Sequence, residues 1–157
     1  VQRRHGEKDV AVILANDESL FVPVNAAGEV LFTVEPSPAL GRDVLILPGG
    51  GVEPGEAVDV AGNRELQEEI GYRAERIDFV AEMHPWAKYL EVTTYIYVAR
   101  GLVASNLQGD EDYAIGIRRV PLADFEGLID LGELTDARVI AALYLTRRFL
   151  QRENKQP

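Results

Sequence analysis

The chain has no cysteine among its 157 residues. This excludes disulfides, thiolate nucleophiles and cysteine metal sites, and it suits a reducing cytoplasm, where we expect the protein to reside. Long apolar runs are missing too, because no stretch approaches the roughly 20 residues that span a bilayer, and none resembles a signal peptide. We therefore expect no membrane partner.

Positive charge is scarce as well. Sixteen lysines and arginines face 26 acids, which gives a formal net charge of −10. This argues against duplex DNA or an anionic membrane, because such partners require many phosphates to be neutralised. We therefore expect no nucleic acid as a partner, whereas a small anion carried by a metal ion is still allowed.

The composition, with 46% hydrophobic and 27% charged residues, is that of an ordinary globular protein, and the length predicts one domain over residues 1–157. Because the chain starts at Val1 rather than at a methionine, we interpret the polar residues 1–9 as the remnant of an upstream segment.

Apolar patterns and turn residues predict the order of elements. Strands are predicted at 10–14, 20–24, 30–34, 43–47, 76–83, 90–99 and 115–120, and helices at 58–70, 122–130 and 135–151. The run at 10–14 is typical of a buried strand, Pro23 favours an edge position for the second, and 76–83 and 90–99 suggest an antiparallel pair. This order predicts a mixed α/β fold with a sheet sandwiched between helices.

The most informative stretch is 50–72, a glycine loop followed by an acidic helix. Glu65, Glu68 and Glu69 share one helix face, where like charges repel by about 0.2–0.5 kcal/mol per pair. Arg64 is the only cation in this stretch. A divalent metal ion would supply the missing positive charge, and carboxylate oxygens are the ligands that Mg²⁺ and Mn²⁺ prefer. A solvated acidic face is the alternative explanation.

The same stretch resembles the Nudix box, G-x5-E-x7-R-E-U-x-E-E-x-G-U, at every specified position. The matching residues are Gly50, Glu56, Arg64, Glu65, Leu66, Glu68, Glu69, Gly71 and Tyr72. Outside the box, residues 28–56, Gly109-Asp110-Glu111 and 135–138 resemble the ADP-ribose pyrophosphatase branch, which includes ADP-compound hydrolases. The chain is thereby identified as a member of the Nudix superfamily, and the resemblance implies the Nudix α/β/α sandwich.

The resemblance also implies roles for the box residues. Glu65, Glu68, Glu69 and the carbonyl of Gly49 would bind Mg²⁺, with Mn²⁺ as a possible substitute. Arg64 would pair with box acids, and the i+4 spacing allows it to reach Glu68. Gly50, Glu56 and Gly71 would shape the loop and the helix end. Glu69, Arg64 and Glu111 form the predicted catalytic set.

Further candidates lie outside the box. Glu111, with Asp110 and Asp112 beside it, is the predicted general base or water-positioning residue, and an exposed acid without a role is its alternative. Predicted substrate-binding residues are Arg42, Gly50, Trp86 and Glu91. Trp86, together with His84 and Tyr89, is predicted to stack on adenine or contact ribose, or else to pack in the core or at its rim. Pro85 comes slightly earlier than the corresponding proline of the branch.

The resemblance implies a metal-dependent hydrolase that splits the pyrophosphate of a nucleoside diphosphate linked to another moiety, with ADP-ribose or a related ADP compound favoured. Alternatives are a dinucleoside polyphosphate or nucleoside triphosphate pyrophosphohydrolase, and a non-catalytic nucleotide sensor. A homodimer is expected. The branch commonly exchanges an upstream β-segment between subunits, and the short N-terminus leaves open whether that segment is lost or the dimer forms differently.

Overall fold

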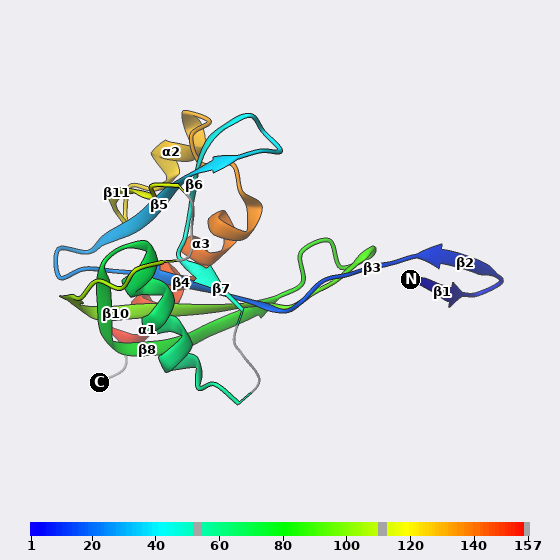
Figure 1. Ribbon diagram of the computed structural model, residues 1–157, viewed down its shortest axis with the longest axis horizontal. Coiled ribbons are helices and arrows are strands. Elements are labelled where there is room, and N and C mark those ends of the chain that lie inside the picture. Colours follow the sequence, from blue (N-terminus) through cyan, green and yellow to red (C-terminus); the bar gives the residue numbers. More distant parts are fainter. Residues whose placement is uncertain (52–54, 110–112, 156–157) are drawn as a thin grey trace.

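The structure, a computed structural model, describes residues 1–51, 55–109 and 113–155 (Figure 1). Two sheets form its body. The four-stranded sheet consists, in spatial order, of β7 (Gly49–Gly50), β4 (Glu18–Pro23), β10 (Thr94–Ala104) and β8 (Tyr72–Met83). The three-stranded sheet consists of β11 (Gly116–Pro121), β5 (Glu29–Ser37) and β6 (Arg42–Ile46).

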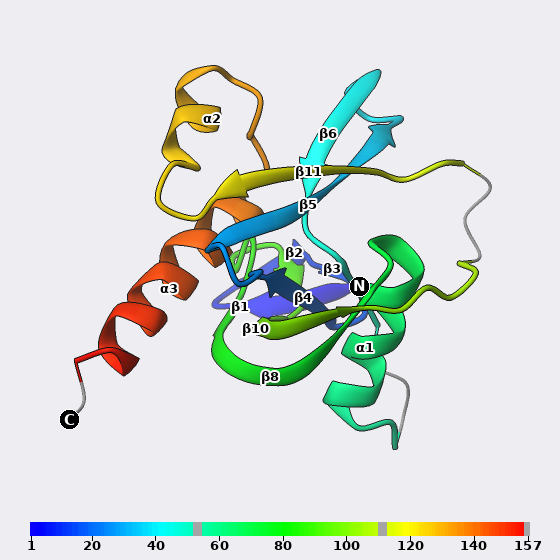
Figure 2. The same cartoon turned by 90° about the vertical axis from the view of Figure 1, so that its left-hand side faces the viewer.

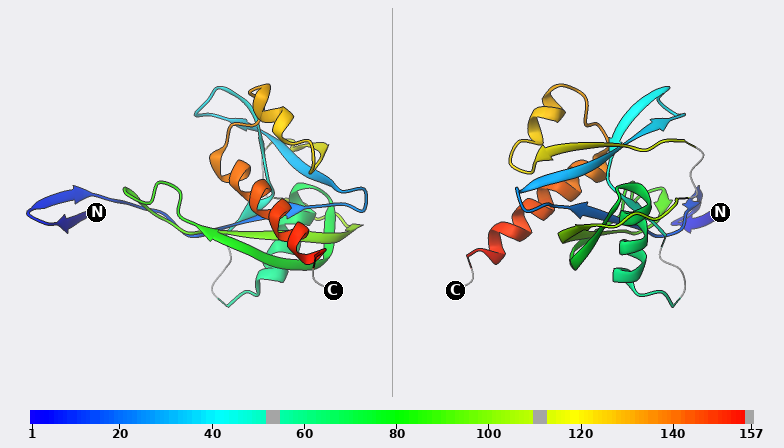
Figure 3. Two further views of the ribbon diagram at one scale, coloured as in Figure 1. Left: turned by 180° about the vertical axis from the view of Figure 1, so that it is seen from behind. Right: turned by 60° about the vertical axis from the view of Figure 1, so that its left-hand side comes forward.

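The four-stranded sheet is mixed and covered on both faces. β10 runs parallel to β4 and antiparallel to β8, as predicted for 76–83 and 90–99. Helix α1 (Val58–Glu69) packs on one face and α3 (Ala137–Glu153) on the other (Figures 2 and 3). Successive side chains of β4 point to opposite faces of the sheet. Phe21 therefore packs in the hydrophobic cluster with α1, and Val22 packs in the cluster with α3. The predicted mixed α/β sandwich is confirmed.

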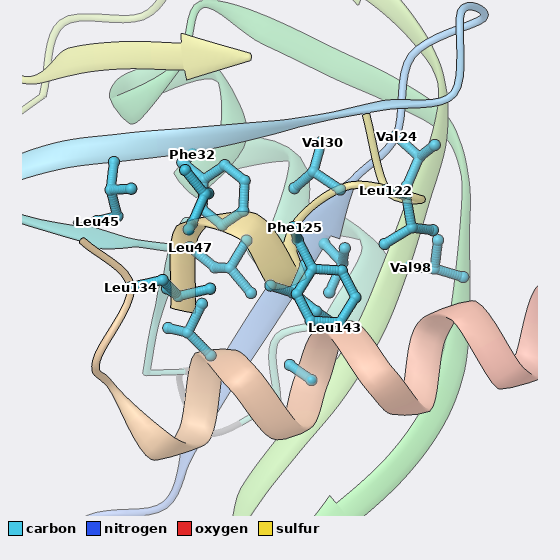
Figure 4. Close-up of a cluster of buried hydrophobic side chains, with 14 of the residues drawn as sticks. Val24, Val30, Phe32, Leu45, Leu47, Val98, Leu122, Phe125, Leu134 and Leu143 are labelled. Carbon is cyan, nitrogen blue, oxygen red and sulfur yellow. The ribbon is translucent and has the colours of Figure 1, made fainter. Parts of the chain in front are cut away.

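The main hydrophobic core lies between the two sheets, α2 (Glu126–Asp130) and α3 (Figure 4). Phe32 from β5, Phe125 beside α2 and Leu143 from α3 are fully buried there. A smaller cluster joins the other face of the four-stranded sheet to α1 through Phe21, Leu66 and neighbouring apolar side chains. Burial of one such large side chain contributes roughly 1.5–3 kcal/mol, so these clusters hold α1 firmly on the sheet.

The start of α3 is fixed by charge as well as by packing. Asp136 caps the helix by accepting from the backbone amides of Arg138 and Val139. The guanidinium of Arg138 donates to Asp136 and, at 2.8 Å, to both carboxylate oxygens of Glu18 on β4. Glu18 also accepts from the buried hydroxyl of Thr94 on β10. This network ties α3 to the beginnings of two central strands.

Two predictions about strand environment are wrong. Residues 10–14 are divided between β2 (Lys8–Ala11) and β3 (Ile13–Leu14), and Ile13 is 59% exposed rather than buried. These residues are exposed because they lie outside the two main sheets. β2 pairs with β1 (Gln2–His5) in a hairpin that projects from the body, and β3 pairs with β9 (Leu90–Glu91) (Figures 1 and 3). This hairpin with β3 is called the arm below.

The second error concerns β4, which lies between β7 and β10 and not at an edge. Within the described residues, β7 pairs only with Ser19 and Leu20, so the ladder on that side does not extend to Pro23. A proline that lacks an amide hydrogen is therefore tolerated. None of the helices in the described ranges is long and apolar enough to cross a membrane.

Candidate active site

The glycine loop places backbone directly against the acidic helix. β7 pairs with β4, so that Gly50 lies opposite Ser19 and Gly49 opposite Leu20. A side chain at Gly49 would collide with the carbonyl oxygen of Ser19, and a Cβ at Gly50 would lie 2.5 Å from Oε1 of Glu65. Glycine is required at Gly49, because the neighbour there is backbone that cannot move aside, whereas a side chain at Gly50 would have to displace the carboxylate of Glu65.

A hollow of about 550 Å³ lies at this junction. It is lined by six residues predicted from the sequence (Gly49, Gly50, Arg64, Glu65, Glu68 and Glu69), together with Gln108 and Gly109. This hollow is called the acid hollow below. The structure thus gathers most of the box residues with predicted polar or backbone roles in one place. The exceptions are Glu56, which pairs with Arg64 but does not line the acid hollow, and Gly71, which lies at the end of α1.

Arg64 links the acids to one another. Its Nη1 lies 2.7 Å from Oε1 of Glu65 and 3.5 Å from Oε2 of Glu68, and its Nε lies 3.6 Å from Oε1 of Glu56. The predicted contact between Arg64 and Glu68 is confirmed. Burial alone would lower the pKa of Arg64. The negative charges and hydrogen bonds of Glu65 and, to a smaller extent, Glu56 outweigh it and raise this pKa above its ordinary value. The guanidinium therefore joins the loop residue Glu56 to the helix.

The donor set suits a hard divalent cation. Within residues 1–51, 55–109 and 113–155, no three His, Cys, Asp or Glu side chains lie close enough together to hold one metal ion, and Glu65 and Glu68 are turned toward Arg64. Nevertheless Glu65, Glu68 and Glu69 all line the acid hollow beside the backbone of Gly49. Carboxylate and carbonyl oxygens are the donors that Mg²⁺ and Mn²⁺ prefer, with water and phosphate oxygens completing the shell.

A third wall of the acid hollow depends on Gln67, which the sequence did not single out. Its Oε1 accepts a hydrogen bond of 2.7 Å from the hydroxyl of Ser105, and its carbonyl accepts from the amide of Leu107 at 3.2 Å. The amide of Ser105 donates to the carbonyl of Gly71 at 2.9 Å. These bonds hold segment 105–109, and hence Gln108 and Gly109, against the end of α1. Gln67 occupies an unspecified box position, so only the structure reveals its partner.

Several predicted substrate contacts lie elsewhere. Trp86 is 75% exposed, has a left-handed backbone (φ 57°) and borders a different hollow of about 520 Å³ with Met83 and Arg138. Glu91 forms an ion pair with Arg3 of the arm. Arg42, at the start of β6, donates to the hydroxyl of Thr135 at 3.3 Å. Of the predicted substrate-binding residues, the structure places only Gly50 in the acid hollow.

The other neighbours named from the sequence have local partners or are not described. A ring nitrogen of His84 lies 3.4 Å from the carbonyl oxygen of Val92, and the ammonium of Lys88 lies over the Tyr89 ring at 5.3 Å. Gly71 has a positive φ of 72°, as its predicted role at the end of α1 requires. Glu111, Asp110 and Asp112 fall outside the described residues, so their role stays a prediction.

The site thus combines a glycine loop with an acidic helix beside a mixed sheet that lies between helices. The chain belongs to the Nudix family, since it matches the NUDIX domain over residues 10–143. The predicted assignment to this family of hydrolases is thereby confirmed.

Within the Nudix family, the chain is similar to hydrolases of ADP compounds. The chain is 34% identical over 106 residues to the ADP compounds hydrolase NudE of Escherichia coli (strain K12), covering 68% of this chain and 57% of that protein. It is 25% identical over 136 residues to the ADP-ribose pyrophosphatase of Bacillus subtilis (strain 168), covering 85% and 69%. A crystal structure of an ADP compounds hydrolase matches with a TM-score of 0.82 and 28% identity, covering 89% of this chain and 75% of that one. The chain thus matches less than two thirds of the length of NudE.

Proposed function

We propose that the chain is a divalent-metal-dependent pyrophosphohydrolase of ADP-ribose or a related ADP compound. The observation that carries the proposal is the acid hollow, in which Glu65, Glu68 and Glu69 from one helix face meet the glycine loop. The similarity to an ADP compounds hydrolase and an ADP-ribose pyrophosphatase supports the choice of substrate. The products would be AMP and the phosphorylated remainder.

In the proposed reaction, the oxygen of water forms a bond to one phosphorus atom of the diphosphate, and the bridging oxygen leaves with the other. Glu65, Glu68, Glu69 and the Gly49 carbonyl would hold Mg²⁺, which polarises phosphoryl oxygens and neutralises charge when bound. Arg64 keeps Glu65 and Glu68 beside the glycine loop. Glu111 is our candidate to accept the proton of water or to orient it.

We also propose that the protein works as a homodimer. The β1–β2 hairpin is almost entirely exposed, Ile13 and Leu14 beside it are 59% and 51% exposed, and an isolated two-stranded hairpin is marginally stable at best. A second copy that covers the arm would bury these side chains. Light scattering on the purified protein tests this proposal, and a monomeric mass at working concentrations would contradict it.

The activity is tested by incubating the protein with Mg²⁺ and a panel of ADP-ribose, dinucleoside polyphosphates, NADH and nucleoside triphosphates, and by measuring the release of AMP and phosphate-containing products. Glu68→Gln should reduce turnover by about 100-fold or more, because removal of a metal ligand weakens binding of the ion. Glu82→Gln is the matched control, since Glu82 is an exposed acid on β8 that does not line the acid hollow and does not belong to α1.

The same panel separates the alternatives. If the protein hydrolyses a dinucleoside polyphosphate or a nucleoside triphosphate faster than the ADP compounds, that compound becomes the proposed substrate. The acid hollow is then still the proposed site. Release of no product from any compound, combined with saturable binding of a nucleotide, would favour the non-catalytic sensor. Near-normal activity of Glu68→Gln would contradict the assignment of the acid hollow as the metal site.

A further inference from the structure

The glycine loop depends on one strand for its place in the sheet. Within the described residues, β7 lies at the edge of the four-stranded sheet and pairs only with β4, where Gly50 lies opposite Ser19. The amide of Phe21 on β4 also donates to the carbonyl of Pro48 at 2.8 Å, directly before Gly49. Both glycines line the acid hollow. A shift of the first residues of β4 would therefore move one wall of the acid hollow.

The first residue of β4 is held from the opposite face of the sheet. Glu18 directly precedes Ser19, and each of its carboxylate oxygens accepts from Nη1 of Arg138 at 2.8 Å. Arg138 lies in the first turn of α3, which covers the face opposite α1 (Figure 2). Oε1 of Glu18 also accepts from the buried hydroxyl of Thr94 on β10 at 2.7 Å. A helix on one face is thus bonded to the strand that carries the site on the other face.

Charge explains why the start of β4 depends on Arg138. The side chains of Glu18 and Arg138 are only 28% and 36% exposed, so a Glu18 carboxylate without its cation would lack both full hydration and a partner charge. It would then favour a position nearer to water, away from Thr94 and from the line of β4. Asp136 accepts from the same guanidinium at 2.9 Å, which fixes the orientation of Arg138. Arg138 is therefore a fixed anchor and not a freely moving surface cation.

We propose that Arg138 is a positioning residue for the glycine loop. Through Glu18 it fixes the start of β4, and β4 fixes the position of Gly49, whose carbonyl is a proposed metal ligand. Arg138 does not line the acid hollow, so it acts only through these residues. The link to the metal rests on the proposed function, because the acid hollow is the proposed metal site, whereas the placement of the loop does not.

The first measurement follows the loop in the metal-free protein. Hydrogen exchange resolved by NMR gives the rate of the Phe21 amide, which is bonded to Pro48, relative to the slowest core amides, which report global unfolding. Arg138→Met should raise this relative rate by about 10-fold, because the strand opens locally. Arg147→Met is the matched control, since Arg147 lies on the same helix but pairs with Glu126 of α2 at 2.7 Å. It should leave the relative rate unchanged.

The second measurement is the affinity for Mn²⁺ without substrate, followed by electron paramagnetic resonance. Arg138→Met should weaken the binding of Mn²⁺ by about 10-fold, because groups that orient a metal ligand typically contribute about 10–100-fold to affinity. Arg147→Met should bind Mn²⁺ like the wild type. Arg138→Lys should recover part of the affinity, since an ammonium keeps the charge but not the guanidinium geometry that bonds Glu18 and Asp136 together.

Two results would overturn the placement of the loop by Arg138. An unchanged relative rate at Phe21 in Arg138→Met would show that β4 stays in place without it, and equal effects of both methionine variants would show a loss of stability alone. If Arg138→Met does not fold, Glu18→Gln takes its place with the same outcomes, because it keeps an acceptor for Thr94 and removes the charge that faces Arg138.

The metal is judged separately. Faster exchange at Phe21 combined with an unchanged affinity for Mn²⁺ would overturn the link between Arg138 and the metal site. If the wild type binds no Mn²⁺, the proposed function fails, and the exchange rates in the metal-free protein still decide whether Arg138 places the glycine loop.

Discussion

Gly62 on α1 lies directly against the ring of Phe21 on β4. A Cβ at Gly62 would lie 2.5 Å from Cε1 of that ring and 3.0 Å from the Cδ1 atom of Ile77. Glycine inside a helix costs up to about 1 kcal/mol relative to alanine, and this contact explains why the cost is accepted here. Gly62 therefore allows α1 to approach the four-stranded sheet closely.

We therefore expect Gly62→Ala to destabilise the protein by about 1–3 kcal/mol, because overpacking outweighs the gain in helix propensity. The matched control is Gly127→Ala in α2, where nothing lies within 4 Å of the added Cβ and where alanine should stabilise by about 0.5–1 kcal/mol. Urea unfolding of both variants measures the two effects. Equal changes of the same sign would contradict the steric explanation.

A second prediction concerns the bond between Gln67 and Ser105. Ser105→Ala and Gln67→Leu should each lower kcat several-fold, because segment 105–109 loses a bond that holds one wall of the acid hollow. Each should cost about 1 kcal/mol of stability. The double variant should be little worse than Gln67→Leu alone, which removes the bond to Ser105 and also the bond that Nε2 of Gln67 donates to the carbonyl of Asn63. Additive losses in kcat would show that the two side chains act independently.

A third prediction concerns pH and Asp136. Burial alone would raise the pKa of Asp136, but the hydrogen bonds and charge of Arg138 lower it below its ordinary value of about 3.9. The charged carboxylate therefore adds stability that is fully present above about pH 4 and is lost as the pH falls through the lower, folded-state pKa.

Asp136→Asn isolates this charge, since asparagine caps a helix about as well as aspartate. The variant should be less stable than the wild type at neutral pH, and the difference should shrink below about pH 4. Urea unfolding as a function of pH measures it. A difference that stays constant with pH would mean that the charge of Asp136 contributes nothing.

The sequence predicted the site better than its surroundings. The box spacing identified residues that the structure gathers in one hollow, because loop and helix are contiguous in the chain and local geometry determines their relation. Gln67 and Ser105 could not be paired from the sequence, because 38 residues separate them and their contact depends on how β8 and β10 return to α1. The exposure of Ile13 was missed for a similar reason, since an apolar run predicts burial only if another element covers it.

The candidate substrate residues illustrate the same limit. Trp86 and Glu91 have side chains that could contact a substrate, but neither lines the acid hollow. Glu91 pairs with Arg3 of the arm, and Trp86 shares another hollow with Arg138. Chemical type can be assigned from one sequence, but position around a site made by several strands depends on tertiary structure.

The last prediction tests the metal site without relying on turnover. Glu65, Glu68 and Glu69 repel one another on one helix face, and Arg64 offsets only part of that charge, so a bound cation should stabilise the fold. Mg²⁺ at about 100 times its Kd should add about 2.7 kcal/mol to the free energy of unfolding, which thermal unfolding detects as a higher Tm. Glu69→Gln should show a much smaller rise, whereas Glu82→Gln should respond like the wild type. If Mg²⁺ raised the Tm of Glu69→Gln as much as that of the wild type, Glu69 would not be a ligand, because linkage requires the ion to bind the folded state through the residue that is removed.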